Sequence, residues 1–419
     1  MANWNNHRLK SVSPMKILFY NHTGQVGGAE RLLLTLLEQL DGSRFASVLV
    51  CPAEGPLNQL AHQTGVKTET IDGLKARFTW RFDHLIGYLL SFGRIMLQLR
   101  KKVNGIQPDL IHANSVRAGL VATIATAGLR QRVVWHIHDL LPRHPFNTII
   151  RAIASLSSRT RILAVAQASA DRLVGDFAGL QGRASVIPNA VDLEKFSVNR
   201  AARERIRRET QIQERAPVIG MIGRLTPAKG QLEMLKLFPR VLDQLPEAKL
   251  LIAGAPAFNN EHEYLELLKR TITEMNLSDR VRMLGSRDDI ADILQALDLL
   301  VVNSASEACS LVILEAMASG TPVLATSTGG TPEIIEHQRN GWLVKFPSDD
   351  ELATGVIRLL NDADTRARIS SQALRDAATR YSIPRFIAEM HSFYGAVLNE
   401  CRIPQQKNLP NLEVNLTLD

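Results

Sequence analysis

The chain has few of the residues and segments that mark secreted, disulfide-bonded or membrane-spanning proteins. Its 419 residues include only three cysteines, Cys51, Cys309 and Cys401, whose wide spacing provides neither a disulfide framework nor a set of metal ligands. No apolar run reaches the roughly 20 residues that a membrane span requires, and the N-terminus lacks the basic-then-apolar pattern of a signal peptide. We therefore expect a reduced protein of the cytoplasm.

Aromatic residues are also scarce, at 5% of the chain, and they do not alternate with basic residues in a nucleic-acid-binding pattern. We therefore expect no nucleic-acid partner. The net charge of +7 is unevenly distributed, because residues 1–190 hold 22 Lys and Arg against 11 Asp and Glu, whereas residues 191–419 hold 27 against 31. This asymmetry predicts two domains with different partners, and anionic lipid headgroups or phosphate-bearing acceptors suit the basic half.

Short apolar runs rich in β-branched residues alternate with helical patterns along the chain, which is typical of an α/β protein with parallel sheets. One series of strands is expected at 16–22, 45–51, 109–114, 132–139, 161–166 and 184–190, and a second at 217–223, 248–254, 281–285, 297–304 and 321–326. Each series forms one doubly wound domain, with the boundary in the region of "PNAVDLEKF" and the Arg-rich segment after it. Domains at 14–192 and 193–380 follow, with loose termini at 1–13 and 402–419.

In doubly wound sheets, ligands bind beyond the carboxyl ends of the strands. After the first predicted strand, glycines including Gly27 and Gly28 precede a helix, an arrangement that lets the backbone approach an anion. The spacing differs from the dinucleotide pattern G-x-G-x-x-G, so a nicotinamide site is not expected, and a purely structural turn remains an alternative. In the second domain, Arg224 and Lys229 follow a strand and precede a helix, where two cations suit a diphosphate.

The segment "HIHD" ends another predicted strand and places His136 and His138 on one face. With His112 they could bind a metal ion. Alternatively, His138 could hydrogen-bond a sugar hydroxyl, or the histidines could simply belong to the core.

Two glutamates, Glu307 and Glu315, flank the predicted start of a helix near Ser310. The first free N–H groups of that helix, from Ser310 to Val312, suit a phosphate. A carboxylate can accept hydrogen bonds from two vicinal hydroxyls of a ribose or a hexose. Together these features favour a nucleotide sugar as the ligand.

The segments "GGAERLLL", "VIPNAVDLEKF", "GMIGRLTPAKGQLEML" and "SASEACSLVILEAMASGTPVLATSTGGTPEIIEHQRNGWLV" carry a resemblance to family 4 retaining glycosyltransferases, over about residues 16–395. The resemblance implies the GT-B architecture, two Rossmann-like domains facing across a cleft. It also implies that the 381–400 helix packs back on the N-terminal acceptor domain and that the C-terminal domain binds the donor.

The resemblance implies roles for the residues singled out above. Arg224 and Lys229 would bind the donor diphosphate, Glu315 the ribose and Glu307 the transferred hexose. Leu311 and Val312 would complete the phosphate site after Ser310, Gly27 and Gly28 would close on the phosphates, and His138 would reach the sugar near its reacting carbon. The family uses no divalent metal and no cofactor, and the one Asp-x-Asp, at 362–364, lies far from any predicted strand end.

The chain departs from the family pattern at a few positions. Ala308-Cys309-Ser310 replaces the frequent Gly-Phe-Gly, Asn189-Ala190 replaces Asn-Gly, and Gln167 stands where serine is common. Small but non-glycine residues restrict φ in the first of these segments, so the donor geometry there is expected to differ. Cys309 has no evident base partner, which favours an apolar packing role.

The segment 78–103 is apolar along much of its length and surrounded by arginines and lysines. It predicts either a basic amphipathic helix on an anionic membrane surface or a partly buried helix with a basic end.

The leading hypothesis is a hexosyltransferase acting on a glycan or lipid-linked acceptor in cell-surface polysaccharide or glycolipid synthesis, at the inner face of the membrane. The alternatives are a sugar-nucleotide epimerase of the same architecture and a non-catalytic sugar-nucleotide-binding partner.

Overall fold

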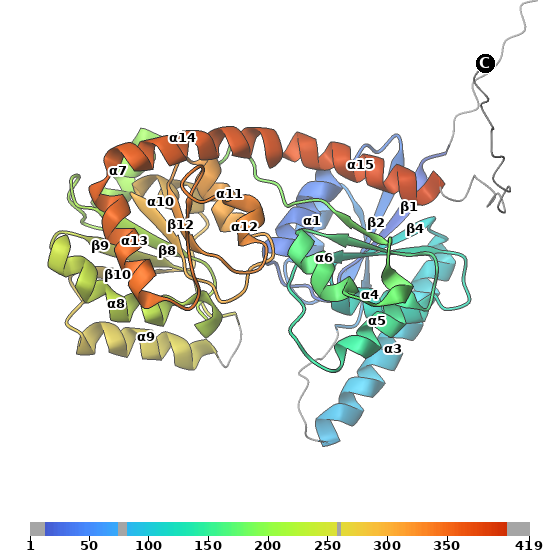
Figure 1. Cartoon of the computed structure of the whole chain (residues 1–419). Helices are drawn as coiled ribbons and strands as arrows, with labels where there is room; N and C mark the ends of the chain where they lie inside the picture. The colour runs from blue at the N-terminus through green and yellow to red at the C-terminus, as the bar shows by residue number, and fades with distance from the viewer. Residues whose placement is uncertain (1–12, 74–81, 258–260, 400–419) are drawn as a thin grey trace, which may run out of the picture.

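The computed structural model describes residues 13–73, 82–257 and 261–399. Two parallel sheets lie side by side, each sandwiched between helices (Figure 1). The predicted termini at 1–13 and 402–419 fall almost entirely outside the described residues, as do residues 78–81 of the amphipathic segment.

The N-terminal sheet has the strand order β3-β2-β1-β4-β5-β6-β7, and every neighbouring pair is parallel. Its strands are β1 (Met15–Tyr20), β2 (Phe45–Pro52), β3 (Lys67–Ile71), β4 (Leu110–Ala113), β5 (Arg132–Ile137), β6 (Thr160–Ala164) and β7 (Ala184–Val186). Its helices are α1 (Gly28–Gln39), α2 (Leu57–Gln63), α3 (Phe82–Ile106), α4 (Val116–Ala125), α5 (Asn147–Ser155), α6 (Gln167–Val174) and the 3-10 helix η1 (Ala178–Leu180).

The C-terminal sheet has the order β10-β9-β8-β11-β12-β13 and is also fully parallel. Its strands are β8 (Val218–Ile222), β9 (Lys249–Ala253), β10 (Val281–Gly285), β11 (Leu299–Val302), β12 (Val323–Thr326) and β13 (Trp342–Val344). The helical elements are α7 (Arg200–Glu209), η2 (Pro227–Lys229), α8 (Gln231–Gln244), α9 (His262–Glu274), α10 (Ile290–Ala296), α11 (Leu311–Ala318), α12 (Thr331–Ile334), α13 (Asp349–Asn361) and α14 (Ala363–Arg380).

The last helix, α15 (Ile383–Asn399), leaves the C-terminal half and packs on the first sheet. Phe386, Met390 and Tyr394 are fully buried in one cluster with Ile17 and Leu49 of the N-terminal strands. Figure 1 shows α14 and α15 running end to end along both halves of the molecule. The C-terminal helix therefore ties the two halves together.

Both sheets reverse their strand order at one point, between β1 and β4 in the first and between β8 and β11 in the second. Loops that leave neighbouring strands in opposite directions open a crevice at such a point, and ligands bind there. The Gly27-Gly28 turn follows β1, and Arg224 and Lys229 follow β8. The folds of both halves thus bring the predicted binding loops to these crevices.

The sequence predicted all the central strands but missed β3 and β13, which are short and form edges of the two sheets. The strand predicted at 132–139 ends at Ile137, so His138 lies just beyond it. The Arg-rich segment at the predicted boundary forms a helix. It contains α7, where Arg207 is buried, donates to three backbone carbonyls of residues 213–216 and pairs with Asp298 at 2.7 Å.

Candidate functional site

Two charged residues on neighbouring loops form the centre of the C-terminal crevice. Lys229, at the end of η2 after β8, pairs with the carboxylate of Glu307, which follows β11 and is buried. Between η2 and α8, Gly230 has φ +68°, and a Cβ there would lie 2.3 Å from the carbonyl oxygen of Asn303. Glycine therefore allows the two loops to pack closely enough for the ion pair to form.

Arg224 lies on the same loop as Lys229. Its Nε is 3.4 Å from a carboxylate oxygen of Glu261, and nearly half of its side-chain surface is open to solvent. Two cations thus lie on the segment that follows β8, a placement that suits a diphosphate.

The start of α11 provides backbone donors three residues after Glu307, the partner of Lys229. Ser310 is the N-cap and makes no side-chain hydrogen bond to the helix, so Leu311 and Val312 begin the first turn with no side-chain cap from Ser310. Helix N-terminal N–H groups and the helix dipole favour an anion. The prediction of a helix start near Ser310 agrees with this structure.

Glu315 lies on α11, one turn past its start, and is half-buried. Its carboxylate makes no hydrogen bond or ion pair with any side chain of the described residues 13–73, 82–257 and 261–399. Burial raises the pKa of Glu315, while the charges of Arg31 and Lys195 lower it. A half-buried carboxylate without a partner is available to accept from ligand hydroxyls.

The N-terminal half comes very close to this region. A Cβ added at Gly28 would lie 3.0 Å from Cδ1 of Leu311, and one at Gly329 would lie 2.3 Å from Cδ1 of Leu140. Asn189 donates from Nδ2 to the Cys309 carbonyl at 2.7 Å. The structure therefore places the Gly27-Gly28 turn directly opposite the start of α11.

His138 approaches the same place from the carboxyl end of β5. Its Nε2 is 2.9 Å from Oδ1 of Asn114, and burial lowers its pKa to about 3, so the ring is neutral at ordinary pH. The loop continues through Asp139 to Leu140, which packs against the loop of Glu307. His138 thus lies on a loop of the N-terminal half whose Leu140 reaches the loop of Glu307.

Asp139 and Glu333 were not singled out by the sequence analysis. Burial raises the pKa of Asp139, on which the charges of Arg224, Glu307 and Lys229 also act, so this carboxylate belongs to the cleft. Glu333, on α12, accepts hydrogen bonds from the backbone N–H groups of Gln167 and Ala168 at 2.7 and 2.8 Å. Neither residue carries a sequence signal of its own, because only tertiary contacts give them a partner.

The metal-site alternative for the histidines does not fit the structure. His112 Nε2 and His136 Nδ1 lie 3.2 Å apart and hydrogen-bond to each other. No group of three or more His, Cys, Asp or Glu side chains in the described parts of the chain is placed to hold a metal ion. Cys309 is buried, and burial raises the pKa of its thiol to about 12, as a packing role requires.

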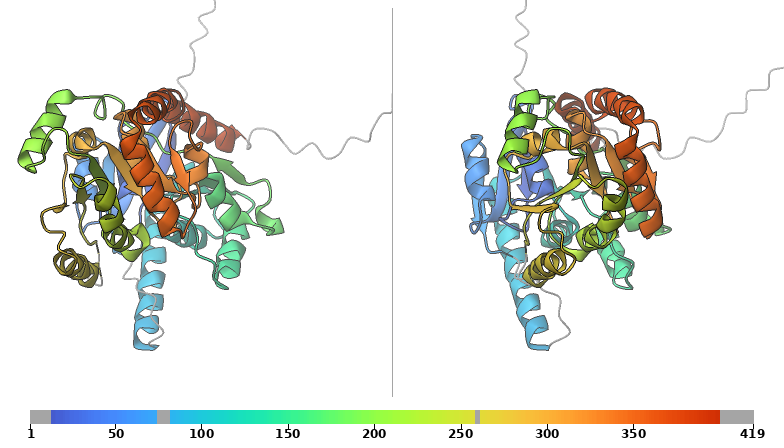
Figure 2. Two further views of the ribbon diagram at one scale, coloured as in Figure 1. Left: turned by 60° about the vertical axis from the view of Figure 1, so that its left-hand side comes forward. Right: turned by 90° about the vertical axis from the view of Figure 1, so that its left-hand side faces the viewer.

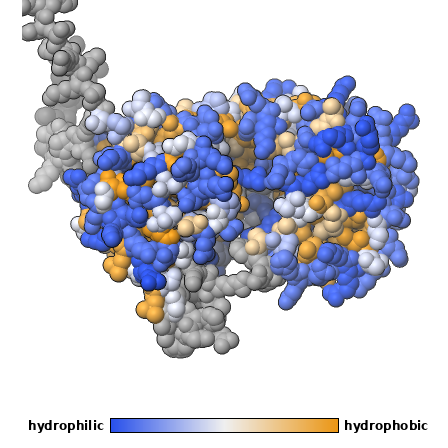
Figure 3. Space-filling model, turned by 180° about the vertical axis from the view of Figure 1, so that it is seen from behind, coloured by the Kyte–Doolittle hydropathy of each residue, from blue (hydrophilic) through white to orange (hydrophobic). Residues whose placement is uncertain are grey.

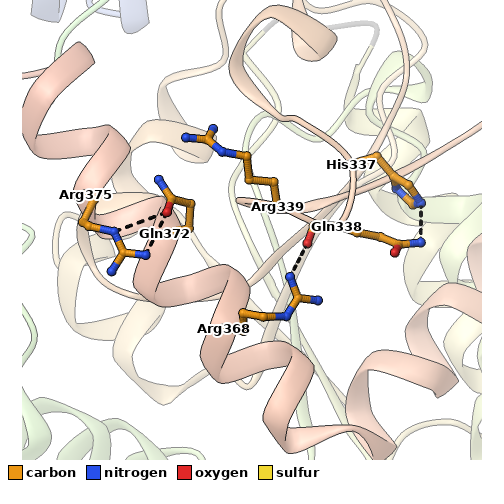
Figure 4. Close-up of a pocket in the computed structure, with 6 residues that line it drawn as sticks. All are labelled: His337, Gln338, Arg339, Arg368, Gln372 and Arg375. Carbon is orange, nitrogen blue, oxygen red and sulfur yellow. Dashed lines mark hydrogen bonds between the residues drawn. The ribbon is translucent and has the colours of Figure 1, made fainter.

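A surface pocket of about 300 Å³ lies on the C-terminal half, beside α14 (Figure 4). Arg339, Arg368 and Arg375 line it with neighbouring polar side chains. Arg339 pairs with Asp376 at 3.0 Å, and Arg375 contacts Gln372. None of the site residues described above lines this pocket, so it is separate from the cleft.

The two halves match different family descriptions. Residues 26–195 match "Glycosyltransferase Family 4", and residues 202–376 match "Glycosyl transferases group 1". The chain belongs to glycosyltransferase family 4. The family assignment favours the glycosyltransferase over the epimerase and the non-catalytic partner, and the enzyme has the GT-B fold expected from the sequence.

Similar proteins cover most of the length of this glycosyltransferase. It is 25% identical over 363 residues to the UDP-Gal:alpha-D-GlcNAc-diphosphoundecaprenol alpha-1,3-galactosyltransferase of Escherichia coli, covering 84% of this chain and 89% of that protein. It is 27% identical over 377 residues to a D-inositol 3-phosphate glycosyltransferase of Corynebacterium urealyticum, with coverage of 86% and 88%. The crystal structure of Anabaena Alr3699/HepE in complex with UDP-glucose has a TM-score of 0.78 and 27% identity, covering 91% of this chain and 100% of that one.

Proposed function

We propose that this glycosyltransferase moves a hexosyl group, with retention of anomeric configuration, from a UDP-sugar to a lipid-linked or glycan acceptor. The observation that carries the donor assignment is the geometry of α11. Its start follows Glu307, which pairs with Lys229, and Glu315 lies one turn past that start with no side-chain partner among the described residues. This order of groups suits a hexose, a diphosphate and a ribose in succession.

The uridine base is proposed from relatives. Anabaena Alr3699/HepE was solved with UDP-glucose, and the Escherichia coli relative is named as a UDP-galactose enzyme. Both similarities extend over most of this chain. We therefore propose that residues 193–380 form the donor domain. The acceptor domain would consist of residues 14–192 together with the 381–400 helix.

In the proposed reaction, negative charge develops on the departing nucleotide diphosphate. Arg224, Lys229 and the N–H groups at the start of α11, near Leu311 and Val312, would stabilise it, and each such donor is typically worth about 2.7–4 kcal/mol. The diphosphate would compete with Glu307 for Lys229, which would release the carboxylate to bind the hexose hydroxyls. Gly27 and Gly28 would approach the phosphates, and His138 the sugar.

No separate protein base is assigned. Attack would occur on the face from which the nucleotide leaves, and the departing phosphate oxygen would take the proton from the acceptor hydroxyl. The new glycosidic bond forms as the bond to the phosphate breaks, so charge and protons balance without a metal or cofactor. Closure of the cleft around Gly28 and Leu311 would exclude water and limit hydrolysis of the donor.

A lipid-linked acceptor is proposed because of α3. Among the described residues no helix is both long and apolar enough to cross a bilayer. However, α3 extends beyond the body of the N-terminal half (Figures 1 and 2), and Leu90 and Leu97 on it are 70% and 71% exposed. Arg94 and Lys101 share that face, since the spacing 90, 94, 97, 101 follows one side of a helix.

A stripe of alternating leucines and cations suits the headgroup region of an anionic membrane. Figure 3 shows hydrophobic residues reaching the surface low on the same half. We therefore propose peripheral contact with the inner face of the membrane, which would bring the acceptor domain to a lipid-linked sugar in polysaccharide or glycolipid synthesis.

The donor assignment is tested first by nucleotide binding. The melting temperature is measured with UDP, GDP, ADP and CMP, and with their sugars, in the presence and absence of EDTA. A ligand that binds only the folded state raises it. We expect a metal-independent shift with UDP that Arg224→Ala and Glu315→Ala reduce and Arg368→Ala, in the separate surface pocket, leaves unchanged. A folded wild-type protein that responds to no nucleotide would contradict the proposal.

The acceptor assignment needs transfer assays. Purified enzyme, the donor that gives the largest shift, and radiolabelled hexose are combined with undecaprenyl-diphosphate-linked sugars or with the corresponding free sugars. Label recovered in the lipid phase supports a lipid-linked acceptor. Label recovered only on free sugars would contradict a lipid-linked acceptor and indicate a soluble acceptor instead.

A further inference from the structure

A chain of side-chain hydrogen bonds runs behind the cleft of the N-terminal half, from the glycine turn to His138. Glu30 accepts from the Gly27 N–H at 3.0 Å and from Asn21 Nδ2 at 3.3 Å. Asn114 Nδ2 donates to Asn21 Oδ1 at 3.1 Å, and His138 Nε2 lies 2.9 Å from Asn114 Oδ1. Asn21 follows β1, Asn114 follows β4 and His138 follows β5, so the chain crosses the sheet where its strand order reverses.

These hydrogen bonds can run in only one direction. Asn21 Nδ2 also faces the backbone carbonyl of Thr23 at 2.7 Å. A carbonyl and a carboxylate can only accept, so the nitrogen of the Asn21 amide must lie on that side and its oxygen must face Asn114. Asn114 must then present its NH₂ group to Asn21 and its oxygen to His138.

This direction determines where the proton sits on the imidazole. Because Asn114 Oδ1 can only accept, His138 Nε2 must donate, and the neutral ring carries its lone pair on Nδ1. That nitrogen is buried and has no hydrogen-bond partner among the described residues. Asn21 and Asn114 are themselves buried, at 0% and 1% exposure, so bulk water does not compete for their bonds.

The imidazole ring of His138 is also held by packing. His136 packs against His138 with ring centroids 4.0 Å apart. His136 is in turn bonded to His112, whose Nδ1 is 2.9 Å from the Tyr394 hydroxyl of α15. This second network meets His138 only by packing, so Nε2 is left to Asn114 and Nδ1 has no protein partner among the described residues.

We propose that Asn114, oriented by Asn21 and Glu30, is a positioning residue that holds His138 as the Nε2–H tautomer with the Nδ1 lone pair directed to a hydroxyl of the donor hexose. The inference rests on the proposed function, because it assigns His138 an acceptor role toward the sugar. In this state His138 cannot supply a proton to the leaving phosphate. Its contribution is to orient the sugar, and Asn114 contributes by keeping the other nitrogen occupied.

The tautomer is measured directly, without any activity, by long-range ¹H–¹⁵N NMR of the histidine rings of the full-length protein. His138→Gln identifies the signals of His138. We expect the wild-type ring to carry its proton on Nε2, and Asn114→Leu to produce the other tautomer or a mixture. Asn114→Asp loses the bond to Asn21 Oδ1, since a carboxylate only accepts, but it retains an acceptor for Nε2 and should preserve the tautomer.

Tyr394→Phe is the matched control, because it breaks a buried histidine hydrogen bond of the second network and does not touch Asn114. It should leave the His138 tautomer unchanged. Thermal unfolding of all variants checks that each remains folded. If Asn114→Leu does not fold, the wild-type tautomer together with Asn114→Asp still decides the question, because the wild-type ring must carry its proton on Nε2.

The kinetic readout separates positioning from a general structural effect. Asn114→Leu should lower kcat by about 10- to 100-fold, by analogy with the loss of an outer partner of a metal-bound histidine, with the Kd for UDP alone unchanged. Asn114→Asp should restore much of kcat and add an acidic limb to its pH profile, since a carboxylate favours the protonated imidazole.

Each outcome bears on one of the two proposals. A wild-type proton on Nδ1, or an unchanged tautomer and kcat in Asn114→Leu, would overturn the positioning role even if the enzyme transfers sugar. The predicted tautomer in a protein that binds no nucleotide and transfers no hexose would instead overturn the proposed function.

Discussion

At the scale of single residues, the ionisation of Glu315 is expected to govern donor binding. Burial raises the pKa of this carboxyl group above its usual value. The ionised form, which accepts from both ribose hydroxyls, is therefore fully present only above the raised pKa and is lost as the pH falls through it. Affinity for UDP should thus decline on acidification at a higher pH than an ordinary glutamate would cause.

Glu315→Gln tests this role. Hydrogen bonds to a charged group contribute about 1.5–3 kcal/mol, so the substitution should weaken UDP binding roughly 10- to 150-fold, by calorimetry at neutral pH. The acidic limb of the affinity profile should also flatten. Glu274→Gln, on the surface of α9 in the same half, is the control. Equal UDP affinity in the Glu315 variant and the wild type would remove Glu315 from the donor site.

Arg207 is expected to matter for stability and not for binding. It is 3% exposed, and its guanidinium group connects α7 to Asp298 and to backbone carbonyls including that of Ala296. Removing one member of a buried ion pair typically costs about 3–5 kcal/mol. Arg203 still pairs with Asp298 at 2.7 Å, so the loss here falls mainly on the backbone carbonyls that Arg207 binds. Arg207→Leu should therefore lower the free energy of unfolding in urea by about that amount.

The exposed neighbour Arg208→Leu provides the matched control, expected within about 0.5 kcal/mol of wild type. The double variant Arg207→Leu, Asp298→Asn should lose further stability, because it also breaks the 2.7 Å pair of Asp298 with Arg203. A wild-type unfolding curve for Arg207→Leu would mean that α7 contributes little to the C-terminal half.

At the scale of secondary-structure elements, α3 separates the two interpretations that the sequence left open. The structure buries Ile95, Leu99 and Val103 against the N-terminal core, so one face has the packing role. The opposite face retains Leu90 and Leu97 in solvent. Both interpretations therefore apply, each to a different side of the same helix.

The exposed face should bind anionic vesicles. Leu90→Ser with Leu97→Ser removes apolar burial, and Arg94→Glu with Lys101→Glu removes cations worth about 1 kcal/mol each at an anionic surface. The charge variant should weaken binding to phosphatidylglycerol vesicles at least 30-fold in a sedimentation assay. Val198→Ser, at a 62% exposed aliphatic residue of the C-terminal half, should bind like wild type. Equal binding of all variants would contradict a membrane contact through α3. It would also remove the support that α3 gives to a lipid-linked acceptor.

At the scale of the whole molecule, the relative placement of the two halves depends on a few contacts at the cleft. The Glu333 carboxylate accepts from two N–H groups at the start of α6, and Asn189 reaches the Cys309 carbonyl. Together with Gly28 against Leu311, these contacts keep the N-terminal half against the start of α11. The same residues that close the cleft thus surround its binding loops.

Glu333→Gln should loosen this closed arrangement. It removes a charge from a helix N-terminus and weakens two charge-assisted hydrogen bonds, a loss of about 2 kcal/mol. The radius of gyration of the ligand-free protein in solution X-ray scattering should increase, and kcat/KM should fall, while the Kd for UDP stays close to wild type. Glu336→Gln, in the next loop and paired with Arg339 of the same half, is the control. An unchanged radius in the Glu333 variant would show that other contacts hold the halves together.

The sequence by itself determined the fold class and the central strands, because alternating apolar strands and amphipathic helices are local patterns that persist in the structure. It also indicated the loops after β1, β8 and β11, since glycines, cations and a helix start carry their physical properties with them. The edge strands β3 and β13 were missed because β3 is mostly polar and β13 has only three residues, too few to show a period.

Only the tertiary structure decided which groups act together. It paired Lys229 with Glu307, placed Asp139 near Arg224 and gave Glu333 its partners on α6, all across long sequence separations. It also set the direction of the hydrogen bonds from Glu30 through Asn114 to His138. Such relations depend on distance and orientation between strand ends, and the crossover connections of a parallel sheet bring those ends together only once the whole domain has folded.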